Sequence, residues 1–320
     1  MDESKLIFSI AFAFVDGDVS PNVDSKNRIA TYLKSMCVSL ASVRRFYPET
    51  PIRVFTNLPI SADFGAVLES LNVENRILPF THIAPTGMLD RFQSAFYLLD
   101  VISNLEHEFT HALLDPDMVM VRKLSSDCEQ TTQIMAMPMG YDLDADSNGL
   151  SIRQQIEWHK SHGVTEPHGK HYGGEFYIIP GSEISELSHY FAKAWQFSLS
   201  DFADGKPYAH TEEHIINYAL NYFPITDASK TVARIWTTFK YRRIPVNYQD
   251  LSLWHLPAEK TDGFDRLFKT IRKPDSWFWT SDRDEFRRRM AKTMNLTQSN
   301  FVFRTAKFVK KLQTKFQGMR

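Results

Sequence analysis

Asp115 and Asp117 are the residues in this chain whose type and spacing best suit metal chemistry. They lie in HALLDPDMVM, where a mostly apolar run leads into Asp-Pro-Asp and a second apolar run follows directly. Two carboxylates so close together disfavour joint ionisation in a buried setting, and a divalent cation offsets that cost. Mg²⁺ and Mn²⁺ take carboxylate oxygens as ligands and bridge them to substrate phosphates. The pair therefore predicts a Mn²⁺ (or Mg²⁺) site.

The Asp-x-Asp spacing alone is a weak signal, because it occurs five times in the sequence. The pairs are Asp16/Asp18, Asp115/Asp117, Asp142/Asp144, Asp144/Asp146 and Asp282/Asp284. Aspartate favours turns, so a solvated turn is the ordinary interpretation of any one pair. The pair at 115 differs because it stands between two apolar runs. The pair at 16 also follows a strand-like run, but a loop rich in Pro, Asn and Asp comes after it.

The elements expected before the 115 pair alternate between strands and helices. Apolar runs predict strands at 6–15, 51–57, 73–80 and 109–114, and helical spacing predicts helices at 27–45 and 88–104. This order is typical of an α/β fold, with a mostly parallel, Rossmann-like sheet and helices on both faces. Ligands bind beyond the carboxyl ends of the strands in such sheets. Asp115 and Asp117 follow an expected strand, so they lie where a ligand site is expected.

Two other stretches carry residues that could serve a site. In HYGGEFYIIPG, Gly173 and Gly174 precede an expected strand, where they either let the backbone approach a ligand or form a plain bulge. In HTEEHIINYAL, a threonine N-cap precedes a helix whose first turn holds Glu212 and Glu213. Acidic residues there also complement the helix dipole, so their presence alone assigns no function.

Histidine-rich and acidic stretches offer other interpretations. His255 stands between apolar residues in LWHLP, where a lone histidine is usually a satisfied core residue. The histidines at 159–171 have a spacing that could hold zinc, but Gly and Pro predict a loop and no cysteine completes the ligand set. Residues 144–155 resemble a calcium loop, yet Gln155 stands where a glutamate ligand is required. We interpret these two stretches as polar loops.

Composition limits the class of protein. The chain has 320 residues, 43% of them hydrophobic, which suits one large domain or one and a half. A formal net charge of −1 gives no general attraction to nucleic acid, so no such partner is expected. The two cysteines lack a partner spacing and suit a reducing compartment. The N-terminal apolar run is too short to span a bilayer, so we expect a cytoplasmic protein.

The C-terminal part differs from the rest. We expect a main domain at 1–260 and a helical extension at 261–320 that ends in a basic amphipathic tail. Residues 301–320 hold six basic residues and no acidic one, with apolar residues near one helical face. This pattern predicts an interfacial helix on an anionic membrane surface. A helix packed on the domain with its basic face in solvent explains the pattern almost equally well.

The ordered set DRFQSAFYLLD, LLDPDMVM, HYGGEFYIIPG, HTEEHIINYAL and WHLP resembles the GT-A glycosyltransferases, over about residues 6–257. It is most similar to the retaining, metal-dependent families of glycogenin and the bacterial lipopolysaccharide galactosyltransferases, and to the histo-blood-group transferases. The resemblance implies a GT-A fold and transfer of a hexose from a nucleotide-sugar donor, expected to be a UDP-sugar, with retention of configuration. The acceptor would be a glycan or a lipid-linked chain, in surface polysaccharide synthesis.

The resemblance also implies roles for individual residues. Asp115 and Asp117 would hold Mn²⁺ against the donor diphosphate, and His255 would be a third metal ligand. Arg91, on the expected helix before the Asp-x-Asp strand, would contact the donor, and so would Phe14 near the end of the first expected strand.

The catalytic carboxylate is implied by the blood-group side, where a glutamate at a helix start is followed four residues later by asparagine. Asn217 makes Glu213 the match, whereas alignment on His210 makes it Glu212. Donor contacts are also implied for the two glycines of HYGGEF, Gly173 and Gly174, and for Lys260. WHLPAEK lacks the glycine of the usual His-x-x-Gly-x-x-Lys pattern, although Lys260 still matches its lysine.

Three alternative functions stay open at this point. A nucleotidyltransferase would need a glycine-rich phosphate loop near the first strand, and FVDGDVSPN has one glycine. An inverting GT-A transferase would share most of the motifs. A catalytically inactive protein that binds sugar nucleotides or glycans would keep the fold without turnover.

Overall fold

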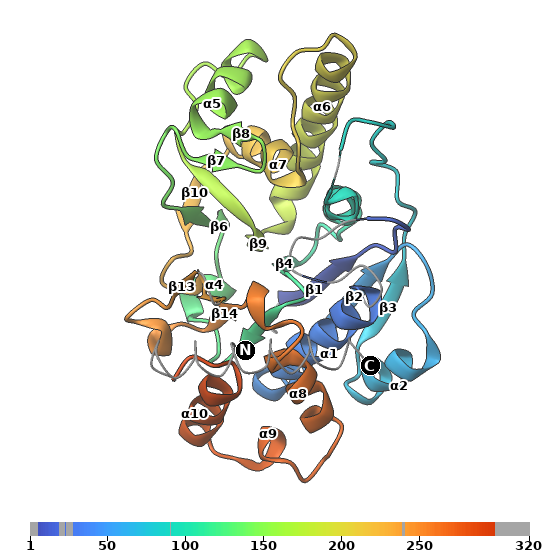
Figure 1. The fold of residues 1–320 in the computed structure, drawn as a ribbon, viewed down its shortest axis with the longest axis vertical. Coiled ribbons are helices and arrows are strands. Elements are labelled where there is room, and N and C mark those ends of the chain that lie inside the picture. Colours follow the sequence, from blue (N-terminus) through green and yellow to red (C-terminus); the bar gives the residue numbers. More distant parts are fainter. Residues whose placement is uncertain (1–5, 19–22, 24–27, 90, 239–240, 298–320) are drawn as a thin grey trace, which may run out of the picture.

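A computed structural model describes residues 6–18, 23, 28–89, 91–238 and 241–297. Its centre is a seven-stranded mixed sheet with the strand order β10-β6-β9-β4-β1-β2-β3 (Figure 1). The strands are β1 (Leu6–Phe12), β2 (Ile52–Thr56), β3 (Glu74–Ile77), β4 (Thr110–Leu114), β6 (Ile134–Met139), β9 (His171–Ile179) and β10 (Ile225–Asp227).

Most neighbouring strands of this sheet are parallel. Strand β1 pairs in parallel with β2 and β4, β2 with β3, and β10 with β6. Strand β9 is antiparallel to both β4 and β6, so β6 runs in the same direction as β4 and β1. The carboxyl ends of β1, β4 and β6 therefore lie at one edge of the sheet. This arrangement confirms the expected mostly parallel α/β sheet.

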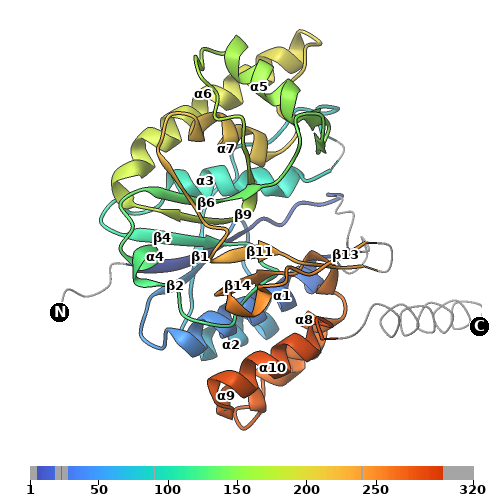
Figure 2. The ribbon, with the colours of Figure 1, turned by 90° about the vertical axis from the view of Figure 1, so that its left-hand side faces the viewer.

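Helices cover both faces of the sheet (Figure 2). One face carries α3 (Tyr97–Ser103), α6 (Ile184–Ala203) and α7 (Glu212–Leu220), and the other carries α1 (Arg28–Phe46) and α2 (Ala62–Ser70). Successive side chains of a strand point to opposite faces, so each strand serves two cores. In β9, Phe176 belongs to the core that contains α1, whereas Tyr177 belongs to the core that contains α6.

A second, three-stranded sheet lies beside the main one and has the order β11-β14-β5. Its strands are β5 (Met118–Met120), β11 (Val232–Arg234) and β14 (Leu253–His255). Two small hairpins complete the strands: β7 (Asp146–Ser147) with β8 (Leu150–Ser151), and β12 (Trp236–Thr237) with β13 (Arg242–Arg243). Strand β5 begins directly after the Asp-Pro-Asp sequence, so this sheet brings a late segment of the chain to the end of β4.

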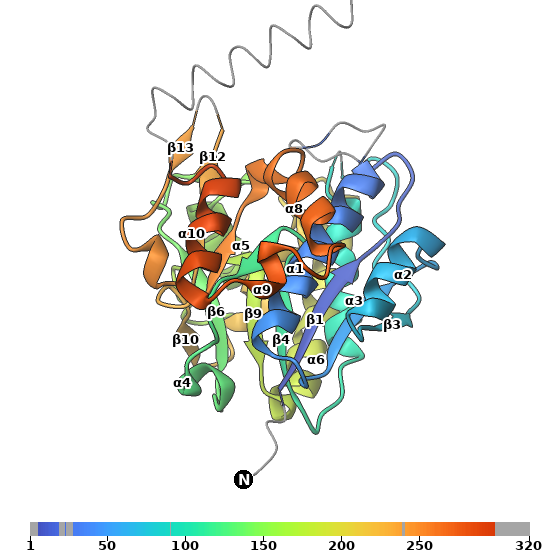
Figure 3. The same cartoon turned by 90° about the horizontal axis from the view of Figure 1, so that it is seen from below.

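The C-terminal helices α8 (Gly263–Ile271), α9 (Trp277–Thr280) and α10 (Arg283–Thr293) pack beside α1 (Figure 3). Phe264 and Phe286 belong to the same hydrophobic core as β1 and α1, and Lys34 of α1 forms an ion pair with Asp265 at 2.6 Å. A division of the chain at residue 260 stays a prediction. The basic tail at 301–320 lies outside the described residues. Within the described ranges, no helix is both long and apolar enough to cross a membrane.

The remaining helical elements are shorter than α1 and α6. They are α4 (Ser126–Glu129), α5 (Ile152–Ser161) and the 3₁₀ turns η2 (Gln93–Phe96), η3 (Gly181–Glu183), η4 (Tyr248–Asp250) and η5 (Pro257–Glu259).

The structure differs from the sequence-based elements in several places. Helices α5 and α6 were not predicted, and α5 begins inside the stretch 144–155 that we interpret as a polar loop. The helix expected at 88–104 begins only with η2 at Gln93, because Phe92 adopts a left-handed φ of 59° and Asp18 accepts hydrogen bonds from the next two backbone N–H groups. Strand β9 begins at His171, so the two glycines lie inside the strand rather than before it. Helix α2 was not among the predicted elements.

Candidate active site

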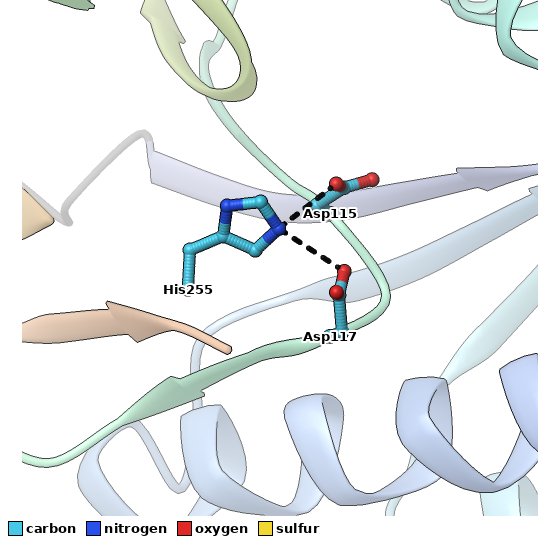
Figure 4. A group of neighbouring side chains, drawn as sticks. All are labelled: Asp115, Asp117 and His255. Atoms are coloured by element: carbon cyan, nitrogen blue, oxygen red, sulfur yellow. Dashed lines mark ion pairs between the residues drawn. The ribbon is translucent and has the colours of Figure 1, made fainter. Parts of the chain in front are cut away.

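Asp115, Asp117 and His255 form a group that could hold a metal ion (Figure 4). His255 Nε2 lies 3.4 Å from Asp115 Oδ2 and 3.4 Å from Asp117 Oδ1. One ligand atom from each residue can be chosen so that all three lie within 4.8 Å of one another. Among the described residues, no other set of three histidines, cysteines or carboxylates meets this criterion.

The fold explains how residues so far apart in sequence meet. Strand β14 pairs antiparallel with β5, and this register sets His255 opposite Met118, next to Asp117. The Leu256 backbone N–H donates to the Asp117 carbonyl at 3.0 Å, and the Asp115 N–H donates to the Glu175 carbonyl at 2.9 Å. The Asp-Pro-Asp turn is thus held between the main sheet and the second sheet.

The two aspartates differ in environment. The Asp117 side chain is 1% exposed, whereas that of Asp115 is 44% exposed and lines the cavity described below. Burial opposes ionisation of Asp117, but Lys260, which is hydrogen-bonded to Oδ2, and His255 hold its pKa well below its ordinary value. The pKa of Asp115 is raised, first by loss of hydration and then by the charge of Asp117. Asp115 therefore resists ionisation beside the charged Asp117, and a bound cation would stabilise the fully ionised pair.

The donor set fits a divalent metal. Asp117 Oδ1 is buried and has no hydrogen-bond partner in the described part of the chain, so one lone pair is left for another ligand. Two carboxylates and one imidazole suit Mn²⁺ and related divalent ions. Carboxylate Oε1 of Glu175 lies 3.4 Å from His255 Nδ1, on the far side of the ring from the aspartates. A carboxylate in that position orients a ligating histidine and fixes which nitrogen carries the proton.

Sequence reasoning missed Glu175 and Arg234, which lie behind this group. Glu175 is fully buried in β9 and accepts two hydrogen bonds from Arg234, at 2.9 and 2.6 Å. Burial alone would raise the pKa of Glu175, but Arg234 and His255 hold it far below its ordinary value. Arg234 Nη2 also lies 3.4 Å from Glu213 Oε1. The one signal in the sequence was Glu175 itself, a charged residue at the start of the apolar run EFYII. A charged residue in a buried strand is expected to have a partner of opposite charge.

Glu213 is held by three partners at the start of α7. Its Oε1 accepts the Gly174 backbone N–H at 2.9 Å and faces Arg234, and its Oε2 lies 3.1 Å from His171 Nε2. The His171 ring is fixed on its other side by Gln155, at 2.8 Å from Nδ1. Burial opposes the charge, but His171 and Arg234 lower the pKa of Glu213 to about 2. Glu213 is therefore ionised at neutral pH.

Glu212 lies beside Glu213 but titrates in the opposite sense. Burial, and after it the charge of Glu213, raises its pKa to about 8. Backbone N–H groups of the first turn of α7 offset only part of the rise. Two neighbouring carboxyl groups whose pKa values differ in this way share one proton at pH 7. This arrangement is associated with catalytic sites.

The two glycines of β9 make room for these carboxylates. A Cβ at Gly174 would lie 2.9 Å from Glu212 Oε1 and 3.1 Å from Glu213 Cγ. A Cβ at Gly173 would lie 2.1 Å from Glu175 Oε2. Both glycines therefore serve a close approach, and the close neighbours are the carboxylates of this site.

A cavity of about 450 Å³ joins these groups. Its lining includes Asp115, Glu212, Glu213, Arg234, His255 and Lys260. The lining also includes Phe12, Ala13, Arg28 and Tyr32 from the β1 and α1 segments, and Tyr141, Ser147, Asn148 and Trp236 from the opposite part of the site.

Three residues expected to bind a donor have different placements. Lys260 lies in the cavity wall with its ammonium bound to Asp117 and 5.0 Å from the centroid of the Tyr32 ring. Phe14 packs edge-on against Phe12, which lines the cavity, and Phe14 itself is not a described lining residue. Arg91 is also not a described lining residue, and its guanidinium lies over the ring of Phe92, which is one. Donor contacts by Phe14 and Arg91 stay predictions.

The rival sites have structural roles. Asp18 is buried, pairs with Arg28 at 3.3 Å and accepts the N–H groups that begin η2. Asp144 is 83% exposed and pairs with Arg153 in the β7–β8 region, within the stretch that resembles a calcium loop. The four histidines at 159–171 do not form a metal group among the described residues.

Comparisons with known proteins agree with the fold. No family model matches the sequence, and no curated protein matches it either. Among solved structures, the bifunctional glycosyltransferase WbbM, in its apo form, aligns with a TM-score of 0.54 at 13% identity, covering 89% of this chain and 52% of that one. The apo form of the glycosyltransferase GlyE of Streptococcus pneumoniae TIGR4 aligns at 0.47 and 10% identity, covering 95% and 63%. Mouse xyloside xylosyltransferase 1 aligns at 0.45 and 10%, covering 78% and 96%.

The chain spans about half of the WbbM chain that it matches. Its mixed, mostly parallel sheet with helices on both faces is a GT-A-like fold, similar to that of the glycosyltransferase WbbM. The expected fold class is thereby confirmed.

Proposed function

We propose that this protein is a metal-dependent glycosyltransferase that moves a hexose from a nucleotide-sugar donor, a UDP-sugar, to a glycan or glycolipid acceptor with retention of configuration. The observation that carries the proposal is one cavity lined both by Asp115 and His255 of the candidate metal group and by the Glu212 and Glu213 pair. A cation site beside an ionised carboxylate suits a reaction in which a diphosphate leaves and a sugar becomes cationic.

Asp115, Asp117 and His255 would hold Mn²⁺, or Mg²⁺. Such an ion, when bound, neutralises charge on the departing nucleoside diphosphate. Lys260 would add a second positive charge, since its ammonium lies in the cavity wall beside Asp117. The bond between the sugar and the phosphate oxygen breaks, and a bond from the sugar to an acceptor oxygen forms.

Glu213 would stabilise the positive charge that develops on the sugar, or trap it covalently. Its ionised state at neutral pH supports this role, because only a carboxylate can do either. Glu212 would keep its proton and donate a hydrogen bond to a sugar hydroxyl. The acceptor hydroxyl loses its proton to the departing phosphate oxygen, which lies on the same face of the sugar.

The setting of the reaction belongs to the same proposal. We place the protein in surface polysaccharide synthesis, in the cytoplasm or on the inner face of a membrane. The basic tail at 301–320 would then attach it to anionic lipid near a lipid-linked acceptor.

The test is a panel of UDP- and GDP-sugars, measured by thermal denaturation and slow donor hydrolysis, with Mn²⁺ and with a chelator. Asp115→Asn is the variant of choice, because replacing Asp117 would leave the buried Lys260 ammonium unpaired and risk misfolding. Asp144→Asn is the matched control, since this exposed aspartate lies in another Asp-x-Asp pair.

We expect one donor to raise the melting temperature of the wild type and of Asp144→Asn, and both proteins to hydrolyse it, only when metal is present. Asp115→Asn should show neither effect. Metal-dependent binding without hydrolysis or transfer would instead indicate a sugar-nucleotide-binding protein. Binding of no donor would refute the proposed function.

A further inference from the structure

The sheet order divides the cavity into two ends. Strands β1, β4 and β6 all end at the same edge, and β4 lies between β1 on one side and β9 with β6 on the other. Asp115 follows β4, so residues after β1 and residues after β6 lie on opposite sides of the metal group. Two strand spacings, about 10 Å, separate β4 from β6.

The end beside β1 suits the nucleotide part of a donor. The lining of this end combines an aromatic side chain with cationic ones. Its residues are Arg28 and Tyr32, with Lys260 beside the metal group. A nucleoside diphosphate offers a flat base and negative oxygens, which match this lining.

The end beside β6 has a different chemical character. Tyr141, in the loop after β6, is 38% exposed, and Trp236 of β12 is half-buried. The Tyr141 ring centroid lies 5.7 Å from that of His171, whose Nε2 contacts Glu213. Tyr141 therefore lines the cavity beside the histidine that contacts Glu213, and Trp236 is a second aromatic residue of the lining.

Polar groups accompany these aromatic rings. Ser147 and Asn148, at the tip of the β7–β8 hairpin, line the cavity beside Tyr141. Thr211 also lines it, and its hydroxyl is buried without a hydrogen-bond partner in the described part of the chain. A sugar ring has an apolar face and a rim of hydroxyls, which a pocket of aromatic side chains and a few placed polar groups recognises.

The charge at this end favours an uncharged ligand. Asp146 of the hairpin lines the cavity, and the cationic lining residue Arg234 is already paired with Glu175 and Glu213. An anionic ligand would meet the charge of Asp146, and Arg234 is already engaged by two carboxylates.

From these observations, we infer that the Tyr141 and Trp236 end of the cavity is the acceptor site, and that it takes a neutral saccharide stacked on these aromatic rings. The inference rests on the proposed function and names the class of acceptor.

The test compares Tyr141→Ala and Trp236→Ala with wild type, using neutral methyl hexopyranosides and their short oligosaccharides as acceptors. Tyr222→Ala is the control, because this half-exposed tyrosine stacks on Tyr190 at 3.8 Å and is not a described lining residue. The readouts are the ratio of saccharide transfer to donor hydrolysis, and saccharide binding by saturation-transfer NMR with Mg²⁺.

We expect both cavity variants to lower the transfer-to-hydrolysis ratio about tenfold and to weaken saccharide binding, with Tyr222→Ala unchanged. An unchanged ratio in both variants would overturn the inference. If the wild type hydrolyses a donor but neither binds nor uses a neutral saccharide, the acceptor site is wrong and the proposed function stands. If the wild type neither binds nor hydrolyses any donor, the proposed function fails and the acceptor site fails with it.

Discussion

The adjacent residues Glu212 and Glu213 should respond in opposite ways when each is replaced by glutamine. Glu213 has a pKa lowered from 4.5 to about 2, so its charge is stabilised in the folded state. This stability is present above pH 4.5 and is lost as the pH falls toward 2. It corresponds to about 3 kcal/mol at pH 7, so Glu213→Gln should lower the free energy of unfolding by about 2 to 3 kcal/mol.

Glu212 should show the reverse, because its pKa is raised from 4.5 to about 8. The unfolded chain releases this proton at pH 7 while the folded chain keeps it, so stability falls as the pH rises from 4.5 to 8. Glu212→Gln removes that cost and should raise the free energy of unfolding by about 3 kcal/mol at pH 7 and about 1 kcal/mol at pH 5.

Urea denaturation of the wild type and both variants at pH 7 and pH 5 measures these differences without any substrate. Asp144→Asn, at an exposed position, serves as the control. Destabilisation by both glutamine variants at pH 7, or a Glu212→Gln effect that does not shrink at pH 5, would refute this account of the pair.

Three further predictions concern the supporting residues. His214 is buried with a pKa lowered by burial to about 3, so this residue alone should contribute about 2 kcal/mol of destabilisation on acidification from pH 7 to 5. His214→Gln should lose that pH dependence and His107→Gln, at an exposed position, should keep it, as urea denaturation can show. Glu175→Gln should weaken Mn²⁺ binding about 10- to 100-fold, measured by electron paramagnetic resonance, because the metal-site imidazole loses its orienting carboxylate. Gly174→Ala should lower the melting temperature and Gly140→Ala should not, since a Cβ meets carboxylate atoms at the first position and nothing within 4 Å at the second.

Much of the fold follows from local patterns in the sequence. The apolar runs at β1 and β2 predict buried strands, and the spacing of apolar residues in α1 predicts a helix. The α/β class could therefore be predicted. The start of η2 could not be predicted, because it depends on Asp18 binding backbone N–H groups 75 residues away. Strand β9 runs through two glycines whose positions are set by close packing rather than by strand propensity: Gly174 packs against α7, and Gly173 packs against the Glu175 and Arg234 side chains.

The site was predictable only in part, for a similar reason. The resemblance to GT-A enzymes pointed to His255, and the pairing of β14 with β5 explains why it meets Asp117. Glu175 and Arg234 lie 59 positions apart and form their ion pair only through the folded arrangement of β9 and β11. The opposite titration of Glu212 and Glu213 likewise depends on Arg234 and His171, which no local pattern connects with α7.

Mn²⁺ binding followed by electron paramagnetic resonance, in the presence and absence of UDP, tests the central claim most directly. Wild type and Asp144→Asn should bind one Mn²⁺ per chain, and UDP should tighten that binding. Asp115→Asn should leave the ion free in solution. Equal Mn²⁺ binding by wild type and Asp115→Asn, or no effect of UDP on either, would contradict the assignment of this cavity to a metal-dependent glycosyltransferase.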